Sequence, residues 1–478
     1  DLYPLPGVDP GKDRDCHMKI GLLPLYIALY DRTSPSMRPR LEAFYQEIAQ
    51  EFAKRGVEVE TSPFCRLKPE FEQAVGKFEA AGVDALVTLH MAYSPSLESI
   101  DVLAGTALPI VVLDTTETLE FTNGQDPVEI DYNHGIHGVM DMCSMLTREG
   151  KDYAVAAGHY RDSDVLDRVC GYVRAAKAAG ALRGARVGLV GGAFDGMGDF
   201  RVPYEELKER FGVEVVEQKA ERMRGWNAAV SEAEVDAEMS ANAEAFDFAG
   251  GVDPDEYRAA VRSCLTLRRC LEEDRLSSFS VNFTCIGGDS GLESMPFLEC
   301  CKAMGRGIGY AGEGDALTAA FVGALMRGYP DTTFVEIFCP DWKNGTLFLS
   351  HMGEINYRIA DTKPCVCRAG VNYTPGGFPY VGYARMKGGA GVYVNVCRGR
   401  DDYKLVAAPA EMLSVDEDTF GRTMRGWMRP RCTTARFLEE LSRNGATHHS
   451  AFVYGATADE IVYFGRRLGL ETAVIGGK

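Results

Sequence analysis

Histidine is scarce in this chain, and most of its histidines lie in a few short motifs. The 478 residues include eight histidines, and seven of them occur in five motifs, of which the last contains the doublet His448-His449. A neutral imidazole is the commonest metal ligand in proteins, and it titrates near neutral pH. Sparse and clustered histidines therefore suggest a metal site, and the carboxylates near them decide its chemistry.

Two glutamates occur in settings that suit metal binding. Glu313 lies between two glycines, directly before an expected helix over residues 316–326. An acidic residue at that place can equally cap the helix, because the helix dipole favours negative charge there. Glu336 interrupts the apolar run 333–338. A buried carboxylate is costly unless it is paired, hydrogen-bonded or bound to metal, so a solvated position at a sheet edge is the alternative.

A predicted hairpin connects Glu336 with a histidine. A turn at Lys343-Asn344-Gly345 separates the strand of Glu336 from a second expected strand, 346–350, which ends at His351. Neighbouring strands lie only about 5 Å apart, so the hairpin can bring Glu336 and His351 onto one face. An ordinary polar histidine at a strand end is the alternative interpretation.

The first third of the chain predicts a doubly wound α/β domain, residues 1–181. Short apolar runs of β type alternate there with longer stretches of helical period, which indicates parallel strands joined by crossover helices. The expected helices cover residues 39–55 and 69–81. The expected strands are 19–25, 57–61, 85–90, 110–114 and 153–157.

The pattern restarts at residues 185–190, a strand that leads into a glycine-rich turn, and it predicts a second α/β domain, residues 182–330. Beyond residue 330 the chain consists of short β-type runs with Gly and Pro between them, which predicts an antiparallel sheet or barrel in residues 331–478. The expected fold class is thus two tandem α/β domains followed by a β-rich domain. Further expected elements are helices 231–248, 255–271 and 458–468, and strands 279–283, 391–396 and 471–475.

Composition excludes several classes of protein. Hydrophobic residues make up 46% and charged residues 25%, as in an ordinary soluble globular enzyme. Acidic residues number 69 against 51 basic ones, and the net charge of -18 argues against nucleic acid as a partner. No run approaches the roughly 20 apolar residues that cross a bilayer, and the first residues lack a signal pattern. We therefore expect a cytoplasmic protein with no membrane partner.

Nucleotide binding and thiol chemistry find little support. Gly307-Ile308-Gly309-Tyr310-Ala311-Gly312 fits the dinucleotide pattern G-x-G-x-x-G, but that motif must follow a strand. The preceding segment, 297–304, predicts a helix, so we expect accidental glycine spacing at a helix-to-helix turn and no nucleotide cofactor. The 14 cysteines contain no Cys-x-x-Cys pair, and buried structural thiols are expected.

The order and spacing of four motifs resemble a known family. Glu313 in Gly-Glu-Gly-Asp, Glu336 in Phe-Val-Glu, His351 in Ser-His-Met-Gly-Glu and the doublet His448-His449 resemble the metal-binding residues of L-arabinose isomerases. Those enzymes belong to the L-fucose and L-arabinose isomerase superfamily. Weaker similarities cover the N-terminal half, in His90-Met-Ala-Tyr-Ser-Pro, Asn133-His-Gly-Ile-His-Gly and Gly158-His159; a loop histidine with local hydrogen bonds is the alternative for each.

The resemblance implies an aldose-ketose isomerase that uses a divalent metal and an enediol mechanism. Glu313 and Glu336 would be both metal ligands and proton-transfer groups, and His351 and His449 would complete the ligand set. This mixed oxygen and nitrogen set suits Mn²⁺, with Co²⁺ or Mg²⁺ as alternatives. The implied substrate-binding residues are His448, His137, Met352 and Tyr93.

The resemblance also implies a homotrimer or homohexamer in which a neighbouring subunit helps to complete the sugar pocket. Two departures from the family pattern, Ile337 after Glu336 and His134 after Asn133, leave the sugar open. L-arabinose, L-fucose, another pentose and a modified hexose all remain candidates.

Two other classes of protein compete with this hypothesis. Tandem α/β units also occur in sugar-binding proteins without catalytic activity, but such proteins have no need of a third, β-rich region with His351 and the distant doublet. Zinc hydrolases usually carry a His-Glu-x-x-His helix, and this sequence contains none. Both alternatives are therefore weaker than the isomerase.

Overall fold

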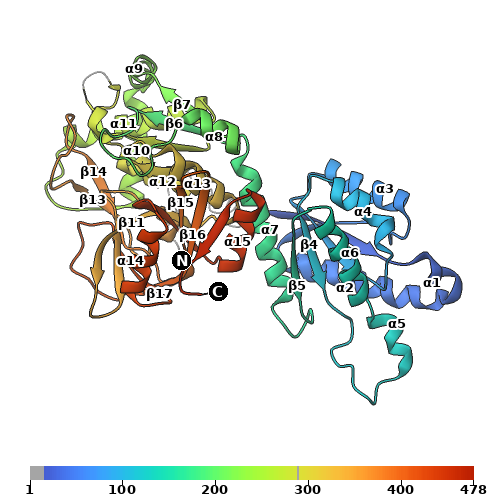
Figure 1. The fold of residues 1–478 in the computed structure, drawn as a ribbon. Helices are drawn as coiled ribbons and strands as arrows, with labels where there is room; N and C mark the ends of the chain where they lie inside the picture. Colours follow the sequence, from blue (N-terminus) through green and yellow to red (C-terminus); the bar gives the residue numbers. More distant parts are fainter. Residues whose placement is uncertain (1–15, 288–289, 478) are drawn as a thin grey trace. The chain divides into compact units, whose positions relative to one another are not determined.

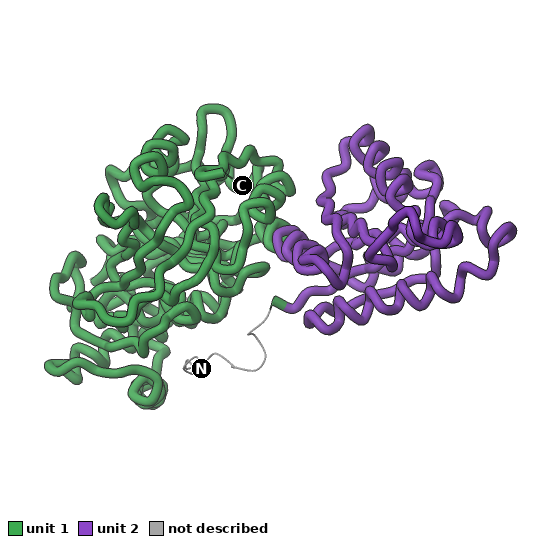
Figure 2. The backbone as a smooth tube through the Cα atoms, turned by 90° about the horizontal axis from the view of Figure 1, so that it is seen from below, with its two compact units in different colours: residues 1–16, 178–478 green, residues 17–177 purple. Residues whose placement is uncertain are grey.

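The computed structural model describes residues 16–287 and 290–477 (Figure 1). By the packing of the chain, residues His17–Lys177 form one compact unit, and the chain from Ala178 onward forms a second (Figure 2). Each unit has its own sheets, and each is described separately below.

The N-terminal unit is a five-stranded parallel sheet with the strand order β2-β1-β3-β4-β5. All five strands expected from the sequence are confirmed, and the expected helices 39–55 and 69–81 are confirmed to within one residue. The strands are β1 (Met18–Leu25), β2 (Val57–Thr61), β3 (Ala85–His90), β4 (Ile110–Asp114) and β5 (Tyr153–Ala157). The helices are α1 (Ala28–Thr33), α2 (Arg38–Lys54), α3 (Lys68–Ala80), α4 (Ser96–Gly105), α5 (Ile130–Asn133), α6 (Ile136–Arg148) and α7 (Val165–Leu182).

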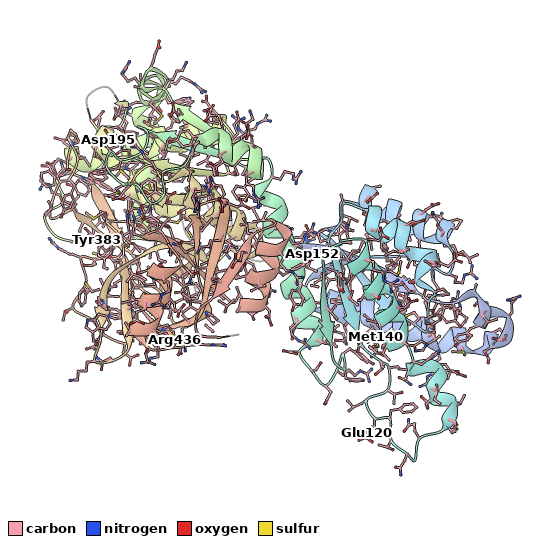
Figure 3. All side chains as sticks on the ribbon, in the orientation of Figure 1. Glu120, Met140, Asp152, Asp195, Tyr383 and Arg436 are labelled. Atoms are coloured by element: carbon pink, nitrogen blue, oxygen red, sulfur yellow. The ribbon has the colours of Figure 1, made fainter. Side chains whose placement is uncertain are left out.

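Burial explains why these strands could be predicted from apolar runs in the sequence. Every residue of β3 is buried, as expected for a central parallel strand that helices cover on both faces. Helix α6 presents Val139, Met142 and Leu146 to the core, whereas Met140 is exposed (Figure 3). The alternation of apolar runs and one-sided helices is therefore sufficient to specify this unit.

The second unit begins with a four-stranded parallel sheet in the order β10-β9-β6-β7. Its strands are β6 (Arg186–Val190), β7 (Glu214–Gln218), β9 (Ser278–Val281) and β10 (Gly309–Gly312). Its helices are α8 (Tyr204–Phe211), α9 (Ala220–Ala229), α10 (Glu232–Ala245), α11 (Pro254–Glu273), α12 (Phe297–Gly305) and α13 (Ala316–Gly328). Helix α13 packs on strands of this sheet and of the following β region, so every residue in it except Arg327 is buried.

The expected helix-to-helix turn at the glycine-rich motif is wrong. Residues Gly309–Gly312 form strand β10, which pairs in parallel with β9 and lies between α12 and α13. A Cβ atom at Gly309 would lie 2.3 Å from the Gly323 nitrogen of α13, so the glycine allows this helix to pack tightly on the strand. The motif therefore precedes and forms a strand, and dinucleotide binding requires the opposite order.

The C-terminal region is a closed antiparallel barrel. Its six strands follow the order β15-β18-β11-β12-β17-β16, pairing of β15 with β16 closes it, and β19 adds to β16 in parallel. The strands are β11 (Thr332–Asp341), β12 (Thr346–Ser350), β15 (Gly389–Arg398), β16 (Tyr403–Met412), β17 (Gly426–Pro430), β18 (His449–Tyr454) and β19 (Glu471–Val474). A side sheet contains β8 (Asp247–Phe248), β13 (Cys365–Arg368) and β14 (Tyr380–Tyr383), and the helices are α14 (Thr434–Arg443) and α15 (Ala458–Arg467).

The predicted fold class, two parallel α/β sheets followed by an antiparallel barrel, is confirmed. The division into domains 1–181, 182–330 and 331–478 remains a proposal, because the central sheet and the barrel share one compact unit. Each of the 14 cysteines is a free thiol. Among the described residues, no helix is both long and apolar enough to span a bilayer.

Candidate metal centre

Strand β11 places Glu336 between two strands that carry other polar residues of the site. Glu336 lies opposite Ser350 of β12 and opposite His449 of β18. The predicted hairpin is confirmed, and His351, directly after β12, has its Nε2 atom 3.7 Å from Glu336 Oε2. Directly opposed residues of antiparallel strands share a face, so Glu336 and His449 project to the same side.

Glu313 occupies a strained backbone position at the end of β10. Its φ angle of 65° lies in the left-handed region, which costs a residue with a side chain about 1–3 kcal/mol. A Cβ atom at Gly312 would lie 2.7 Å from His351 Cε1, and one at Gly314 would lie 2.2 Å from Gly192 O. The two flanking glycines thus allow Glu313 to lie close to His351 and to the loop after β6, whose Phe194 N–H donates to Glu313 O.

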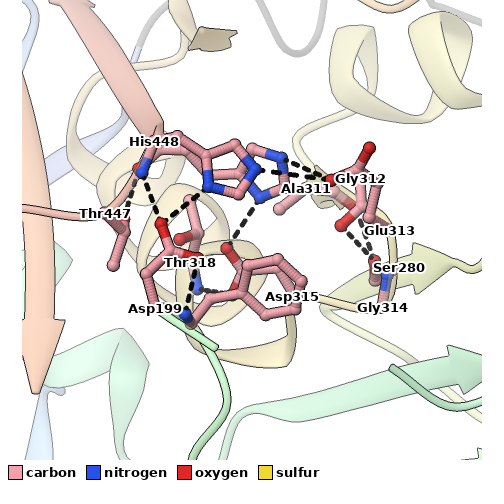
Figure 4. Close-up of polar contacts among 12 residues, drawn as sticks. Asp199, Ser280, Ala311, Gly312, Glu313, Gly314, Asp315, Thr318, Thr447 and His448 are labelled. Atoms are coloured by element: carbon pink, nitrogen blue, oxygen red, sulfur yellow. Dashed lines mark hydrogen bonds and ion pairs between the residues drawn. The ribbon is translucent and has the colours of Figure 1, made fainter. Parts of the chain in front are cut away.

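The structure brings five of the predicted site residues together. Potential ligand atoms of Glu313, His448 and His449 lie within 4.8 Å of one another, and so do those of Glu336, His351 and His449. His449 belongs to both groups and therefore connects them. The part of this cluster around Glu313 and His448 is drawn in Figure 4.

The hydrogen bonds of His351 and His449, which are both buried, leave one ring nitrogen of each free to bind a cation. His449 Nδ1–H donates to Asp315 Oδ2 over 3.0 Å, and His351 Nδ1–H donates to Glu354 Oε2 over 2.7 Å. Carboxylates bonded in this way fix a histidine in the tautomer whose Nε2 is free to bind metal. His449 Nε2 is buried without a hydrogen-bond partner, since the Glu313 Oε2 atom 3.4 Å away lacks the required geometry. Two carboxylates and two imidazoles form a ligand set suited to a divalent cation.

Asp315 and Glu354 were not singled out by the sequence analysis, although both lie in motifs that it used. Asp315 also caps α13, as its Oδ1 accepts from Thr318 N–H over 2.8 Å, so the cap that was the alternative role for Glu313 is formed by Asp315 instead. Glu354 is held by Tyr310, whose hydroxyl donates to its other oxygen over 2.6 Å. A carboxylate two residues after Glu313, or three after His351, was the available signal.

The loop after β6 supplies a further support that the sequence analysis missed. Asp199 Oδ2 accepts from the main-chain N–H of His448 over 2.8 Å and from its Nδ1–H over 2.6 Å (Figure 4). The other ring nitrogen of His448 lies 3.4 Å from Glu313 Oε2. The ring of Phe200 stacks on His449 with centroids 5.2 Å apart. The loop therefore fixes the orientation of both histidines of the doublet.

Burial and the charges of the cluster together shift the pKa values of its two glutamates in opposite directions. Burial would raise the pKa of Glu313, but the contact with His448 and the charge of nearby His449 outweigh it and hold this pKa well below its usual range. Burial raises the pKa of Glu336, and the nearby imidazoles offset this only in part. Burial also opposes a charge on His449, yet Asp315 and Glu313 raise its pKa to about 9. The centre thus combines carboxylates and imidazoles whose protonation states depend on one another.

The other three predicted residues are not part of this cluster of ligand atoms. Met352 lines a cavity of about 550 Å³ that also borders Glu313 and His351. His137 and Tyr93 belong to the N-terminal unit, where their rings stack with centroids 5.0 Å apart, and Tyr93 donates to Asp141 over 3.2 Å. The roles predicted for these three residues remain predictions.

The weaker histidine motifs also belong to the N-terminal unit. His90 is buried, and within the described part of the chain neither of its ring nitrogens has a hydrogen-bond partner. His134 Nε2 lies 3.0 Å from the hydroxyl of Tyr30. His159 Nδ1 accepts from the Arg161 N–H, as the loop interpretation expected, but its Nε2 lies 3.3 Å from Glu117 O, which is 42 residues away in the chain.

Family models and relatives similar in sequence to this chain are described as L-arabinose isomerases. The family model for the L-arabinose isomerase central domain matches residues 205–327, and the one for the L-arabinose isomerase C-terminal domain matches residues 331–471, together more than half of the chain. The L-arabinose isomerase of Herpetosiphon aurantiacus is 27% identical over 81% of this chain and 79% of its own length. The one from Shouchella clausii is 22% identical over 95% of this chain and 93% of its own length.

A solved structure of a sugar-binding protein shows only remote similarity. The solute-binding protein of an Agrobacterium vitis ABC transporter, bound with α-D-tagatopyranose, is 14% identical over 56% of this chain and 77% of its own. The TM-score is 0.14, which is too low to support the sugar-binding alternative.

The fold and the relatives define an enzyme of the isomerase class, one that interconverts an aldose and a ketose. This confirms the isomerase hypothesis over the non-catalytic sugar-binding protein. The chain belongs to the L-arabinose isomerase family.

Proposed function

We propose that this isomerase depends on a divalent metal and works through an enediol, with Glu313 and Glu336 as both metal ligands and proton-transfer groups. One observation carries the proposal. Two histidines, His351 and His449, are each tied at Nδ1 to a buried carboxylate, so that each directs its Nε2 toward a glutamate of the cluster.

The four residues Glu313, Glu336, His351 and His449 would hold Mn²⁺, with Co²⁺ or Mg²⁺ as alternatives. Such a cation polarises a sugar carbonyl and stabilises the negative charge that develops on its oxygen. Four protein ligands leave two octahedral positions for substrate oxygens or water. His448 lies beside Glu313 and is oriented by Asp199, so it is suited to bind a substrate oxygen.

The two glutamates would divide the proton transfer between them. The reaction removes a proton from C2 of the aldose and returns one to C1, which requires a base and an acid close to both carbons. Glu313 is held among His448 and His449, whereas Glu336 lies beside His351. Two carboxylates in different surroundings are suited to such a pair of roles.

The sugar and the assembly form the less specific part of the proposal. Relatives named L-arabinose isomerases make a free aldose the expected substrate class. Ile337 and His134 depart from the family pattern, so another pentose, a 6-deoxy sugar or a modified hexose also fits. We further propose that His137 and Tyr93 contact the sugar from the N-terminal unit of a neighbouring subunit, in a trimer or hexamer.

A metal-reconstitution experiment tests the function. The purified protein is stripped with a chelator, reloaded with Mn²⁺, Co²⁺ or Mg²⁺, and assayed on a panel of aldoses for ketose formation and for exchange of the C2 proton with solvent. Glu313→Gln and Glu336→Gln should each lower turnover by at least about 100-fold. Glu411→Gln, at an exposed position of the barrel strand β16, is the matched control. Full turnover in the first two variants, or in the metal-free protein, would refute the mechanism.

A further inference from the structure

The cavity beside the metal centre extends well beyond the residues that would hold a metal. It has a volume of about 550 Å³, and its lining includes Glu313, His351 and Met352. Cavities of 300–1,000 Å³ typically take ligands of drug size, so this one has room for more than a five-carbon sugar. The substrate can therefore carry additional atoms at the end remote from its carbonyl.

A large part of the cavity lining offers few free hydrogen-bonding groups. Three polar side chains of the lining already donate to the protein: Ser350 to Met424 O, Thr374 to Asn372 Oδ1, and Tyr310 to Glu354. The remaining wall in this part is largely apolar and includes Val281, Phe283, Met295, Phe297, Val371 and Pro379. Hydroxyl groups gain little from such a wall, so recognition of the remote end must come from other residues.

The lining also contains one guanidinium, that of Arg422. Arg422 lines the same cavity at an exposed position, whereas His351 is buried, so the two lie at different depths. Arg385 and Arg425, which are close in the fold, both pair with Asp418. Among the described residues, Arg422 forms no ion pair with a carboxylate. The Arg422 guanidinium is therefore available to an anionic ligand in the cavity.

We propose that this cavity selects aldoses that carry an anionic group at the end remote from the carbonyl, and that Arg422 binds this group. The proposal rests on the proposed function, because it places the carbonyl end at Glu313 and His351. A guanidinium binds the planar carboxylate of a sugar acid and the phosphate of a sugar ester through paired hydrogen bonds. The hydroxyls of Tyr383 and Thr423, which line the cavity too, are suited to assist.

Matched substrates test the proposal in the Mn²⁺-loaded, full-length enzyme. An aldohexose, its 6-deoxy analogue, its 6-phosphate and the corresponding uronic acid differ only at the remote end. We expect kcat/KM for at least one anionic member to exceed that of the neutral aldohexose by tenfold or more. Arg422→Gln should lower this ratio at least tenfold, and Arg429→Gln, at an exposed arginine of strand β17 outside the cavity lining, should leave it unchanged.

The outcomes separate the two proposals. A preference for the uronic acid or for the phosphate identifies which anion is bound. A preference for the neutral aldohexose or the 6-deoxy sugar, with no change of the ratio in Arg422→Gln, overturns the anionic class while the isomerase remains. If no aldose reacts, the proposed function fails. Calorimetry with a hexitol and its terminal phosphate then tests anion binding in the cavity without turnover. Phosphate-dependent binding that Arg422→Gln abolishes supports the proposal, and equal binding of the hexitol and its phosphate overturns it.

Discussion

Two groups of histidines in this protein differ in whether carboxylates bond to their rings. In the C-terminal region His351, His448 and His449 each bond through Nδ1 to a carboxylate. In the N-terminal unit His90, His134 and His137 also lie close together in the sequence motifs and in the fold, but within the described part of the chain none of the three forms an ion pair. The same residue type is therefore used in two opposite electrostatic settings.

The settings have opposite consequences for protonation. Hydrogen bonds to Asp199 and Glu313 raise the pKa of His448 to about 10. Burial without a partner lowers the pKa of His90 to about 3. The first group is surrounded by acidic oxygens that can hold a cation, whereas the second contains a neutral imidazole in a nearly apolar site. The carboxylates, rather than the histidines, distinguish a metal centre from a packed polar core.

Removing one of those carboxylates should have the largest effect. In Asp315→Asn, Oδ1 can still cap α13 through Thr318, but an amide NH₂ then faces His449 Nδ1. The imidazole must accept there, so its proton moves to Nε2 and this nitrogen can no longer bind metal. We expect an affinity for Mn²⁺ that is about 10- to 100-fold lower, measured by calorimetry on the full-length protein.

A second variant and a control are compared with Asp315→Asn for their affinity for Mn²⁺. Glu354→Gln should have a smaller effect than Asp315→Asn. Its amide oxygen can still accept from the Gly353 N–H and from His351 Nδ1–H, while its NH₂ turns to the Tyr310 hydroxyl, so the His351 tautomer is kept. Asp341→Asn changes a half-buried aspartate that orders the hairpin turn, and it should bind Mn²⁺ like the wild type. If Asp315→Asn binds Mn²⁺ normally, Asp315 does not set the tautomer of His449.

Crowding one histidine should have the next largest effect. A Cβ atom in Gly312→Ala would lie 2.7 Å from His351 Cε1, so the ring or strand β10 must shift. We expect a loss of about 1–3 kcal/mol in the free energy of unfolding together with weaker metal binding. Urea denaturation and Mn²⁺ titration measure the two effects. Gly180→Ala in α7, where an added Cβ meets nothing within 4 Å, should be neutral or slightly stabilising, and equal behaviour of the two variants would contradict the crowding.

The comparison also shows which parts of the fold the sequence determines. The five strands of the N-terminal sheet are short, continuous apolar runs, and their bounds were predicted almost to the residue. Strand β10 was missed because Gly309 and Gly312 are chosen for close packing and carry no β-type pattern. Strands β13 and β14 are only four residues long, too short to show a period. Local patterns therefore specify buried parallel strands and fail where tertiary packing sets the residue type.

For the site, the sequence was sufficient to predict the candidate ligands but not the carboxylates that orient them through hydrogen bonds. Glu313, Glu336, His351 and His449 were predicted from motifs, and the structure brings their side chains together. Asp199 could not be predicted, because its role depends on a loop that contacts a residue 249 positions later in the chain. Long-range contacts of this kind leave no trace in spacing or periodicity.

Asp199 offers a smaller perturbation of the first histidine group. Asp199→Asn keeps an acceptor for the main-chain N–H of His448 but removes the charged partner of its ring. We expect kcat/KM to fall about 10- to 30-fold, as for loss of a hydrogen bond to a charged group, while the affinity for Mn²⁺ stays close to normal. Asp195→Asn, in the same loop and fully exposed (Figure 3), is the control. A large loss of Mn²⁺ binding would instead make His448 a metal ligand.

The smallest expected effect concerns the second group, through His90. The folded state holds this ring neutral to about pH 3, whereas the unfolded chain takes up a proton near pH 6.5, so acid favours unfolding. The stability that depends on His90 is complete above pH 6.5 and falls by about 1.4 kcal/mol for each pH unit below it. Nearby His137 and Asp141 affect this titration in opposite directions, and burial outweighs both.

Hydrogen exchange in β3 of the full-length protein measures this pH dependence between pH 7.5 and 5.5. His90→Gln should unfold more easily at every pH, because it also buries an unpaired polar group, but it should lose the extra acid sensitivity of the wild type. His17→Gln, at an exposed histidine beside Glu58, should retain that sensitivity. An unchanged pH slope in His90→Gln would mean that the ring finds a partner in solution, and the contrast between the two histidine groups would then disappear.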